Sequence, residues 1–411
     1  MFLNNTANNV KQVSENKMLF AVFNAHLLDR KQNDNLLELQ IGNEFRKDKL
    51  VSTFSLLEDT VVLENPIGYQ NNTNYQVNNS YIKSKYLLKI NNVSDIATLN
   101  AHQLSNRLEN RDTITTQNPF FINPSFGFNW IINKQNKITT SYAYNTTNAN
   151  ILDVFNYYIH TVFRSFYKAI NSFNQLDATS FSLNYQLGNW DDRFFADTYV
   201  YYNKNFDFFS TNTTLNQNYT RSEKILVKNR ETIGINTKLD YYFKFILSNF
   251  KVDLEFSKSD FLNSINNATL RNVTYHNYNY GFELRSGFSG FFNYHIGTKW
   301  NVINIKTTID NSFTNNQSFL DLSFNFNDKF NVQLQSESYY FGNLATNITY
   351  YFLDMDANYK LIKNKLTLGI TAKNLLNTQK FRNFSISDIG SSTTEYRLLP
   401  RFMLLKMEYR F

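Results

Sequence analysis

The chain lacks cysteine and is poor in proline and glycine. Its 411 residues include 0 Cys, 4 Pro and 12 Gly. The missing cysteine excludes disulfides, zinc–thiolate sites and thiol catalysis, and it suits an oxidising envelope compartment. The low proline and glycine content excludes a collagen-like chain or a flexible linker. Aromatic residues make up 17% of the chain, which argues against disorder, and no composition shift marks a domain boundary.

Long apolar runs are also absent. No stretch of 18 or more residues is continuously apolar, so the sequence offers no transmembrane helix. A membrane protein without such a run must be a closed β-barrel, because in lipid only helices and barrels satisfy every backbone hydrogen bond. The net charge is +7, but the basic residues are spread along the chain. This spread argues against nucleic acid as a partner.

The first residues are polar and rich in asparagine. Residues 1–17 contain neither the basic region nor the apolar region of a secretory signal peptide, which a membrane β-barrel needs for export. We therefore expect an N-terminally truncated chain. Its expected parts are a polar N-terminal segment over residues 1–17, which its composition allows to be disordered, and a barrel over residues 18–411.

Strict alternation of apolar and polar residues is the strongest pattern in the chain. Near the C-terminus, Met403, Leu405 and Met407 alternate with Lys406 and Glu408. This period of two is typical of a strand with one face in hydrocarbon or a core and the other in water. The same pattern recurs over residues 250–256, 353–361 and 366–373.

The predicted connections alternate in length. Short turns are expected near 45–49, 92–94, 133–137, 188–192, 246–249, 288–292, 327–329 and 362–365. Longer loops are expected near 62–77, 107–120, 146–177, 205–224, 258–272, 307–317 and 378–396. Outer-membrane barrels combine short periplasmic turns with long extracellular loops. The pattern therefore predicts an all-β fold, a transmembrane antiparallel up-and-down β-barrel of about eighteen strands in the bacterial outer membrane, with no plug domain in the chain.

Aromatic residues gather where the strands should cross the membrane interfaces. Tyr339-Tyr340-Phe341 and Tyr350-Tyr351-Phe352 lie on the loop side, and Trp130, Phe326 and Phe330 lie on the turn side. Two such belts are expected of a membrane barrel. The alternative is that Phe and Tyr are simply good strand formers, which explains their number but not their positions.

Motifs for catalysis are missing from the sequence. The five histidines are scattered, and neither a His-Glu-x-x-His pair nor a Gly-x-Ser-x-Gly elbow occurs. A phosphate-binding loop and a dinucleotide fingerprint are also lacking. We therefore predict no catalytic, cofactor-binding or metal-binding residues and no cofactor, and we do not expect an enzyme.

Two groups of residues are candidates for ligand contact. Asp354 and Asp356 alternate on one strand face, and Lys373 lies on the polar face of the next strand. The three would line a polar lumen wall, where they either meet an ion or substrate or are simply solvated. The longest loop, 146–177, carries aromatic and basic residues. It could capture an extracellular ligand or pack on itself. Its candidate contacts are Tyr157, Tyr158, Arg164 and Tyr167.

Two C-terminal segments resemble a known family. The run Pro400-Arg401-Phe402 through Tyr409-Arg410-Phe411 resembles the last strand of TonB-dependent outer-membrane receptors. The segment Ala372 to Asn377 is similar to the signature of their penultimate strand. The segment from Asn123-Pro124-Ser125 to Tyr144 resembles the barrel of the branch that carries a carboxypeptidase-regulatory domain. The likeness covers the whole chain as a barrel pattern and about the last fifty residues as motifs.

The resemblance implies particular roles and parts. Tyr409 and Phe411 would belong to the terminal signal read by the barrel-assembly machinery, although Lys406 stands where the family often has Gly. Family members carry an N-terminal plug and a TonB-contacting box, and neither is visible here. Their barrels have 22 strands, so about four strands would also be missing, and the chain would be the C-terminal portion.

The leading functional hypothesis is the barrel of a TonB-dependent receptor that imports a ligand such as a siderophore or an oligosaccharide. The alternative is a passive porin or substrate-specific channel. The expected partners are outer-membrane lipid and lipopolysaccharide, the barrel-assembly machinery, TonB through a plug not present in this chain, and a surface lipoprotein.

Overall fold

The computed structural model describes residues 6–31, 33–111, 113–162, 164–189, 191–342, 348–362 and 365–410. The first elements are β1 (Asn9–Arg30), β2 (Leu36–Glu58), β3 (Val61–Glu64), η1 (Ile67–Tyr69), β4 (Gln70–Ile90), β5 (Val93–Asn110), β6 (Thr113–Gln117), β7 (Phe120–Ile131) and β8 (Asn136–Asn148). The middle of the chain forms α1 (Ile151–Val154), β9 (Ile159–Val162), β10 (Ser165–Lys168), β11 (Gln175–Leu187), β12 (Phe194–Leu215), β13 (Thr220–Phe243), β14 (Ser248–Ile265) and β15 (Arg271–Ser286). The last elements are β16 (Phe292–Lys306), β17 (Asn311–Asn325), β18 (Phe330–Gly342), β19 (Ile348–Ile362), β20 (Leu366–Lys373), β21 (Lys380–Ile386), β22 (Ser391–Arg397) and β23 (Phe402–Tyr409). Neither helix in this part of the chain has the length and apolar character to cross a membrane.

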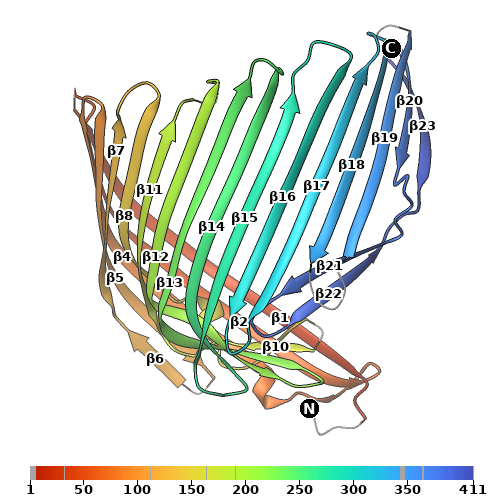
Figure 1. The fold of residues 1–411 in the computed structure, drawn as a ribbon. Helices are drawn as coiled ribbons and strands as arrows, with labels where there is room; N and C mark the ends of the chain where they lie inside the picture. The colour runs from red at the N-terminus through yellow and green to blue at the C-terminus, as the bar shows by residue number, and fades with distance from the viewer. Residues whose placement is uncertain are drawn as a thin grey trace.

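Seventeen strands form one continuous antiparallel wall. Its order is β1-β2-β4-β5-β7-β8-β11, followed by β12 to β20 in sequence and then β23. The sheet has 21 strands because the short strands β3, β6, β9 and β10 pair at one end of the wall. Figure 1 shows the wall curving around an interior, with β21 and β22 crossing its concave side. The predicted all-β, up-and-down antiparallel architecture is confirmed.

The two faces of the wall differ chemically. Residues that touch β21–β22 define the inner face, as Tyr339 does where its ring lies 5.5 Å from that of Phe381. Strand alternation then places Ser338 and Tyr340 on the outer face. Six apolar side chains on the outer face are between 38 and 46% exposed. These are Ile235, Leu254, Phe282, Ile296, Leu320 and Ile370.

The connections follow the predicted order with two kinds of correction. The turns predicted from 92–94 to 327–329 lie at the same end of the wall as the C-terminus (Figure 1). The turn predicted near 45–49 is wrong, because those residues lie inside β2 and the actual turn follows Arg30. The charged run there resembles a turn, yet Asp48 is buried and accepts a 2.6 Å bond from Arg46 Nε on the inner face. Polar residues on a wet inner face are compatible with a strand.

Several predicted long loops are shorter than expected. The segments 205–224, 258–272 and 307–317 are largely strand, since β12 runs to Leu215 and β13 starts at Thr220. These predictions were wrong because segments rich in Thr and Asn were interpreted as loops, whereas threonine is a good strand former. The longest strand, β13, has 24 residues, far more than the roughly 9–11 that a tilted strand needs to cross a bilayer. The residues of β13 beyond those needed to cross the bilayer lie on the loop side of the wall.

The first and last wall strands form its two edges. Among the described residues, β1 and β23 do not pair with each other. Every step along the wall is antiparallel, so with seventeen strands β1 and β23 run in the same direction. Antiparallel closure between them therefore requires an odd number of intervening strands. β1 begins at Asn9, inside the polar segment 1–17.

The buried apolar cores lie on the inner side of the loop end. In the first core, α1 and its neighbours contribute Ile151, Val154 and Phe155, which pack against Leu50 and Tyr75 of the wall. The second core gathers Phe54, Leu56, Tyr69 and Phe166. The segment 149–174 therefore folds inward and covers part of the wall.

Candidate functional site

A row of amide side chains lines the inner face of β13 to β17. Asn236, Asn279, Asn301, Asn315 and Gln317 lie around a depression of about 450 Å³. Asp253, Glu255 and Lys299 also line it. Amides both donate and accept hydrogen bonds, so this surface can bind a ligand rich in hydroxyl or carbonyl groups.

The amides already form a partly connected network. Asn301 Nδ2 donates to Asn277 Oδ1 at 2.8 Å and to Asn279 Oδ1 at 2.5 Å, and Asn279 Nδ2 donates to Glu255 at 3.0 Å. Asn315 Oδ1 is buried and has no hydrogen-bond partner. A buried acceptor without a donor costs free energy, so a donor group from a bound ligand would stabilise this site.

Four ionisable groups meet closer to the turn end of the inner face. Lys299 Nζ lies 3.1 Å from Glu283, and the two nitrogens of His295 lie 3.4 Å from Glu283 and 3.8 Å from Asp321. The cluster mixes both signs of charge. It can bind ionic groups of a passing ligand, but its electrostatic potential does not have a single sign.

The predicted lumen residues Asp354, Asp356 and Lys373 come together. Lys373 Nζ lies 3.1 Å from Asp354 and 3.5 Å from Asp356. Thr371 Oγ1 donates to Asp356 at 2.6 Å, and the backbone nitrogen of Asn374 donates to Asp354 at 2.8 Å. The three residues form one ion-paired group on the inner face, with two carboxylates for one ammonium, and contact with an ion or substrate stays a prediction.

The predicted loop residues lie at the loop end of the interior. The backbone of Tyr157 is joined to the wall through the side-chain amide of Asn71. Tyr157 N donates to Asn71 Oδ1 at 2.8 Å, and Asn71 Nδ2 donates to the Tyr157 carbonyl at 3.0 Å. Tyr158 donates to Glu223, and burial together with this carboxylate raises the pKa of the Tyr158 phenol. The Tyr167 ring packs against Phe155 at 5.8 Å, whereas Arg164 is exposed in the turn between β9 and β10. The three tyrosines thus contact the protein itself, and ligand capture by this group stays a prediction.

The predicted assembly signal lies on the last strand. Tyr409 is 52% exposed and pairs with Leu366 on the outer face. Phe411 lies outside the described residues.

A second loop, which follows β20, folds inward as the hairpin β21–β22. Its Phe381 packs into an aromatic cluster on the wall, with ring centroids 5.1 Å from Tyr350, 5.5 Å from Tyr339, 5.7 Å from Phe341 and 6.2 Å from Phe352. The hairpin covers the loop side of the inner face. The sequence analysis placed a loop at 378–396 but missed this hairpin, whose only clear sequence signal is the turn around Gly390.

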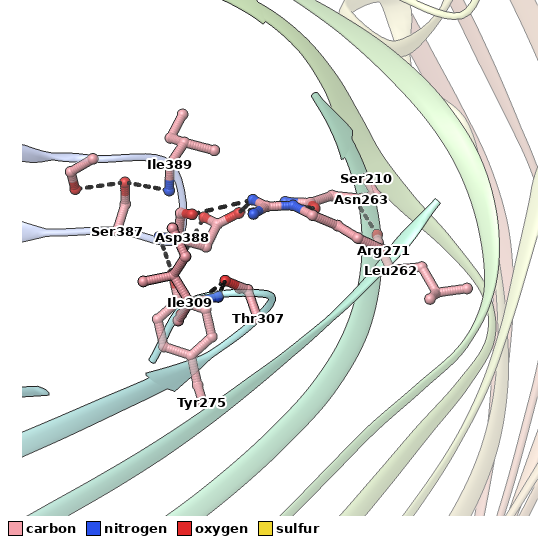
Figure 2. Close-up of polar contacts among 11 residues, drawn as sticks. Ser210, Leu262, Asn263, Arg271, Tyr275, Thr307, Ile309, Ser387, Asp388 and Ile389 are labelled. Atoms are coloured by element: carbon pink, nitrogen blue, oxygen red, sulfur yellow. Dashed lines mark hydrogen bonds and ion pairs between the residues drawn. The ribbon is translucent and has the colours of Figure 1, made fainter. Parts of the chain in front are cut away.

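The structure also brings together residues that the sequence analysis did not consider. Figure 2 shows Arg271, Asn263 and Tyr275 of the wall around Asp388 at the hairpin tip. Asp388 lies more than a hundred positions along the chain from each of the three wall residues, so no local sequence pattern could have joined them. Within the described part of the chain, no group of three or more His, Cys, Asp or Glu could hold a metal ion.

The class defined by this geometry is an all-β barrel wall, apolar outside and polar inside. No protein-family model matches the chain, and no curated protein does. Among solved structures, the copper transporter OprC is 9% identical over 95% of this chain and 72% of its own, with a TM-score of 0.47. The ferric yersiniabactin uptake receptor FyuA from Yersinia pestis is 9% identical over 97% of this chain and 61% of its own, with a TM-score of 0.44. A chain of the FpvAI–pyocin S2 complex is 10% identical over 97% and 50%, with a TM-score of 0.43. This chain thus spans less than two thirds of the last two.

Proposed function

We propose that the chain is the barrel wall of a TonB-dependent receptor in the outer membrane of a Gram-negative bacterium. The observation that carries the proposal is the contrast between the two faces. The outer face presents Ile296, Leu320 and Ile370 to the surroundings, while the inner face carries amides and charges. Soluble monomers rarely expose a continuous apolar surface of this kind, whereas lipid matches it.

The directions of the two edge strands, β1 and β23, favour a barrel with more strands than the seventeen of the wall. Antiparallel closure between β23 and β1 takes an odd number of strands, supplied by this polypeptide or by another. Five further strands would give 22, the size of outer-membrane transporters with a plugged lumen. A total of eighteen would suit a passive channel, which is the second candidate function.

Exposed apolar side chains on the inner face of both edge strands favour the presence of a plug domain. Met18 and Phe20 of β1 and Leu404 of β23 share their face with Asp48, Arg46 and Thr371, respectively. They are 59%, 54% and 56% exposed. A folded plug against these edges would cover them, and it would carry the contact with TonB.

The remaining partners follow from the same location. Lipid and lipopolysaccharide would contact the outer face, and the barrel-assembly machinery would read Tyr409 and Phe411. A surface lipoprotein could cover the loop end. The transported ligand would bind the amide row and the charged residues of the inner face. Both a siderophore and an oligosaccharide offer the hydroxyl and carbonyl groups that amides bind.

The test uses the full-length protein in its bacterial host. Membrane fractionation should place it in the outer membrane, and its recovery in a soluble fraction would contradict the proposal. Uptake of a panel of ferric siderophores and neutral oligosaccharides is then compared with and without a protonophore. A TonB-dependent receptor loses uptake with the protonophore, whereas a passive channel keeps it.

A further inference from the structure

Hydrogen bonds fix the base of the hairpin β21–β22 where the chain leaves the wall. Asn374 Nδ2 donates to the carbonyls of Thr378 at 2.8 Å and Leu399 at 2.9 Å, and Thr378 N donates back to Asn374 Oδ1 at 2.9 Å. Asn374 has a φ of 52°, in the left-handed region that asparagine tolerates. These bonds hold the two legs of the hairpin side by side where it leaves the wall.

The hairpin reaches from its root to a distant part of the wall. Figure 1 shows it crossing the concave side from β19 and β20 toward β15. At about 4.8 Å per strand, five strand spacings are about 24 Å, which matches the length of its strands. The tip turn is shaped by Ser387, whose backbone nitrogen donates to Gly390 O at 2.8 Å.

The tip residue Asp388 is held by several donors. Arg271 Nη2 and Asn263 Nδ2 donate to Asp388 Oδ2 at 2.5 and 2.6 Å, and the Tyr275 hydroxyl donates to Oδ1 at 3.4 Å (Figure 2). Arg271 Nη2 also donates to the Asp388 carbonyl at 3.2 Å, and the Asp388 backbone nitrogen donates to the Tyr275 hydroxyl at 3.2 Å. A guanidinium, an amide and a phenol thus converge on one carboxylate.

The three side chains that donate to the carboxylate all belong to the wall, whereas the carboxylate belongs to the hairpin. Asn263 Oδ1 accepts from Arg271 Nε at 2.9 Å, so the wall residues also orient each other. The side chains of Arg271 and Asp388 are only 18% and 13% exposed. If the hairpin moved away, the wall would keep a cation that has lost its carboxylate partner, with the neighbouring hydrogen-bond donors already in place. Such a cation needs another anion, because leaving it unpaired is costly.

We propose that Arg271, Asn263 and Tyr275 form a carboxylate-binding site at the loop-side mouth, occupied here by Asp388, and that a small external carboxylate competes for it and frees the hairpin. Asp388 then acts as an internal pseudo-ligand. Release of the hairpin uncovers the amide row, which lies closer to the turn end of the same strands. The site depends on the wall alone, so it would serve a receptor or a passive channel.

The test measures citrate binding to the purified full chain by titration calorimetry at constant ionic strength. Asp388→Asn removes the internal competitor, so citrate should bind it about tenfold or more tightly than the parent protein. Arg271→Gln should lose citrate binding. Arg382→Gln is the matched control, because it removes a 2.7 Å ion pair with Glu395 in the same hairpin but leaves the tip intact. It should bind citrate as the parent does.

Hairpin movement is measured in the same proteins. The chain has no cysteine, so nitroxides at Leu215→Cys and Ile389→Cys report one distance without ambiguity. Citrate should broaden this distance in the parent and leave the already broad distribution of Arg271→Gln unchanged. Equal citrate affinity in the parent and Asp388→Asn, or an unchanged narrow distance in Arg271→Gln, would overturn the proposal.

Discussion

Asn315 and Asn316 are neighbours in β17 and face opposite sides of the wall. Asn316 is 9% exposed, and its Nδ2 donates to Thr298 Oγ1 at 2.7 Å on the outer face. Asn315 lines the inner depression, and its Oδ1 is buried without a partner. The same side chain thus has a satisfied structural role on one face and an open hydrogen-bonding position on the other.

A lysine on the outer face should be far more harmful than one on the inner face. Leu322→Lys or Leu368→Lys should lower the free energy of unfolding by about 2–4 kcal/mol, because both positions would place a charge in hydrocarbon. Thr371→Lys adds the same charge to the inner face and should cost much less. Urea unfolding in lipid vesicles measures both. Equal costs would mean that the faces are wrongly assigned.

The packing of segment 149–174 predicts a large effect at one position. Phe155 is 1% exposed in the core with Leu50 and Tyr75, so Phe155→Ala should cost about 3–5 kcal/mol. Leu152 lies in α1, which ends just before Phe155, but it is 58% exposed, and Leu152→Ala should change stability by less than about 0.5 kcal/mol. Denaturant unfolding compares the two variants, and similar effects would show that the segment does not pack inward.

The Asp354–Asp356–Lys373 group should depend on its only cation. Lys373→Met leaves two carboxylates facing each other and should destabilise the protein by about 1 kcal/mol, a modest value because all three side chains are about one-third exposed. Lys373→Arg keeps the charge and serves as the control. If both variants unfold at the same urea concentration, the charge of Lys373 does not matter.

The hairpin should respond to acid through Glu395. Its contact with Arg382, and then that with Lys380, lowers the pKa of the Glu395 carboxyl. The ion pair therefore stabilises the hairpin fully above the ordinary glutamate pKa, and this contribution disappears as the pH falls through the lowered value. A carbon-13 titration should give a midpoint below 4.5 that rises toward 4.5 in Arg382→Gln. An unchanged midpoint would contradict the assigned contact.

The sequence was sufficient for the wall but not for its interior. Alternation between Leu366 and Lys373 predicts β20 and both of its faces, because a period of two is a local property of the chain. The charged run at residues 45–49 was misread because strands that border a wet interior tolerate charges. The contact between Arg271 and Asp388 depends on a hairpin that folds back across five strands, and no local pattern encodes that path.

Spin-label accessibility along β17 tests the central claim, that the outer face meets lipid, most directly. Nitroxides are placed one at a time at Phe319→Cys, Leu320→Cys, Asp321→Cys and Leu322→Cys in lipid vesicles. Positions 320 and 322 should be relaxed mainly by oxygen, which concentrates in lipid, and positions 319 and 321 mainly by a water-soluble nickel chelate. Relaxation without a period of two, or with the two faces exchanged, would contradict a membrane-embedded wall.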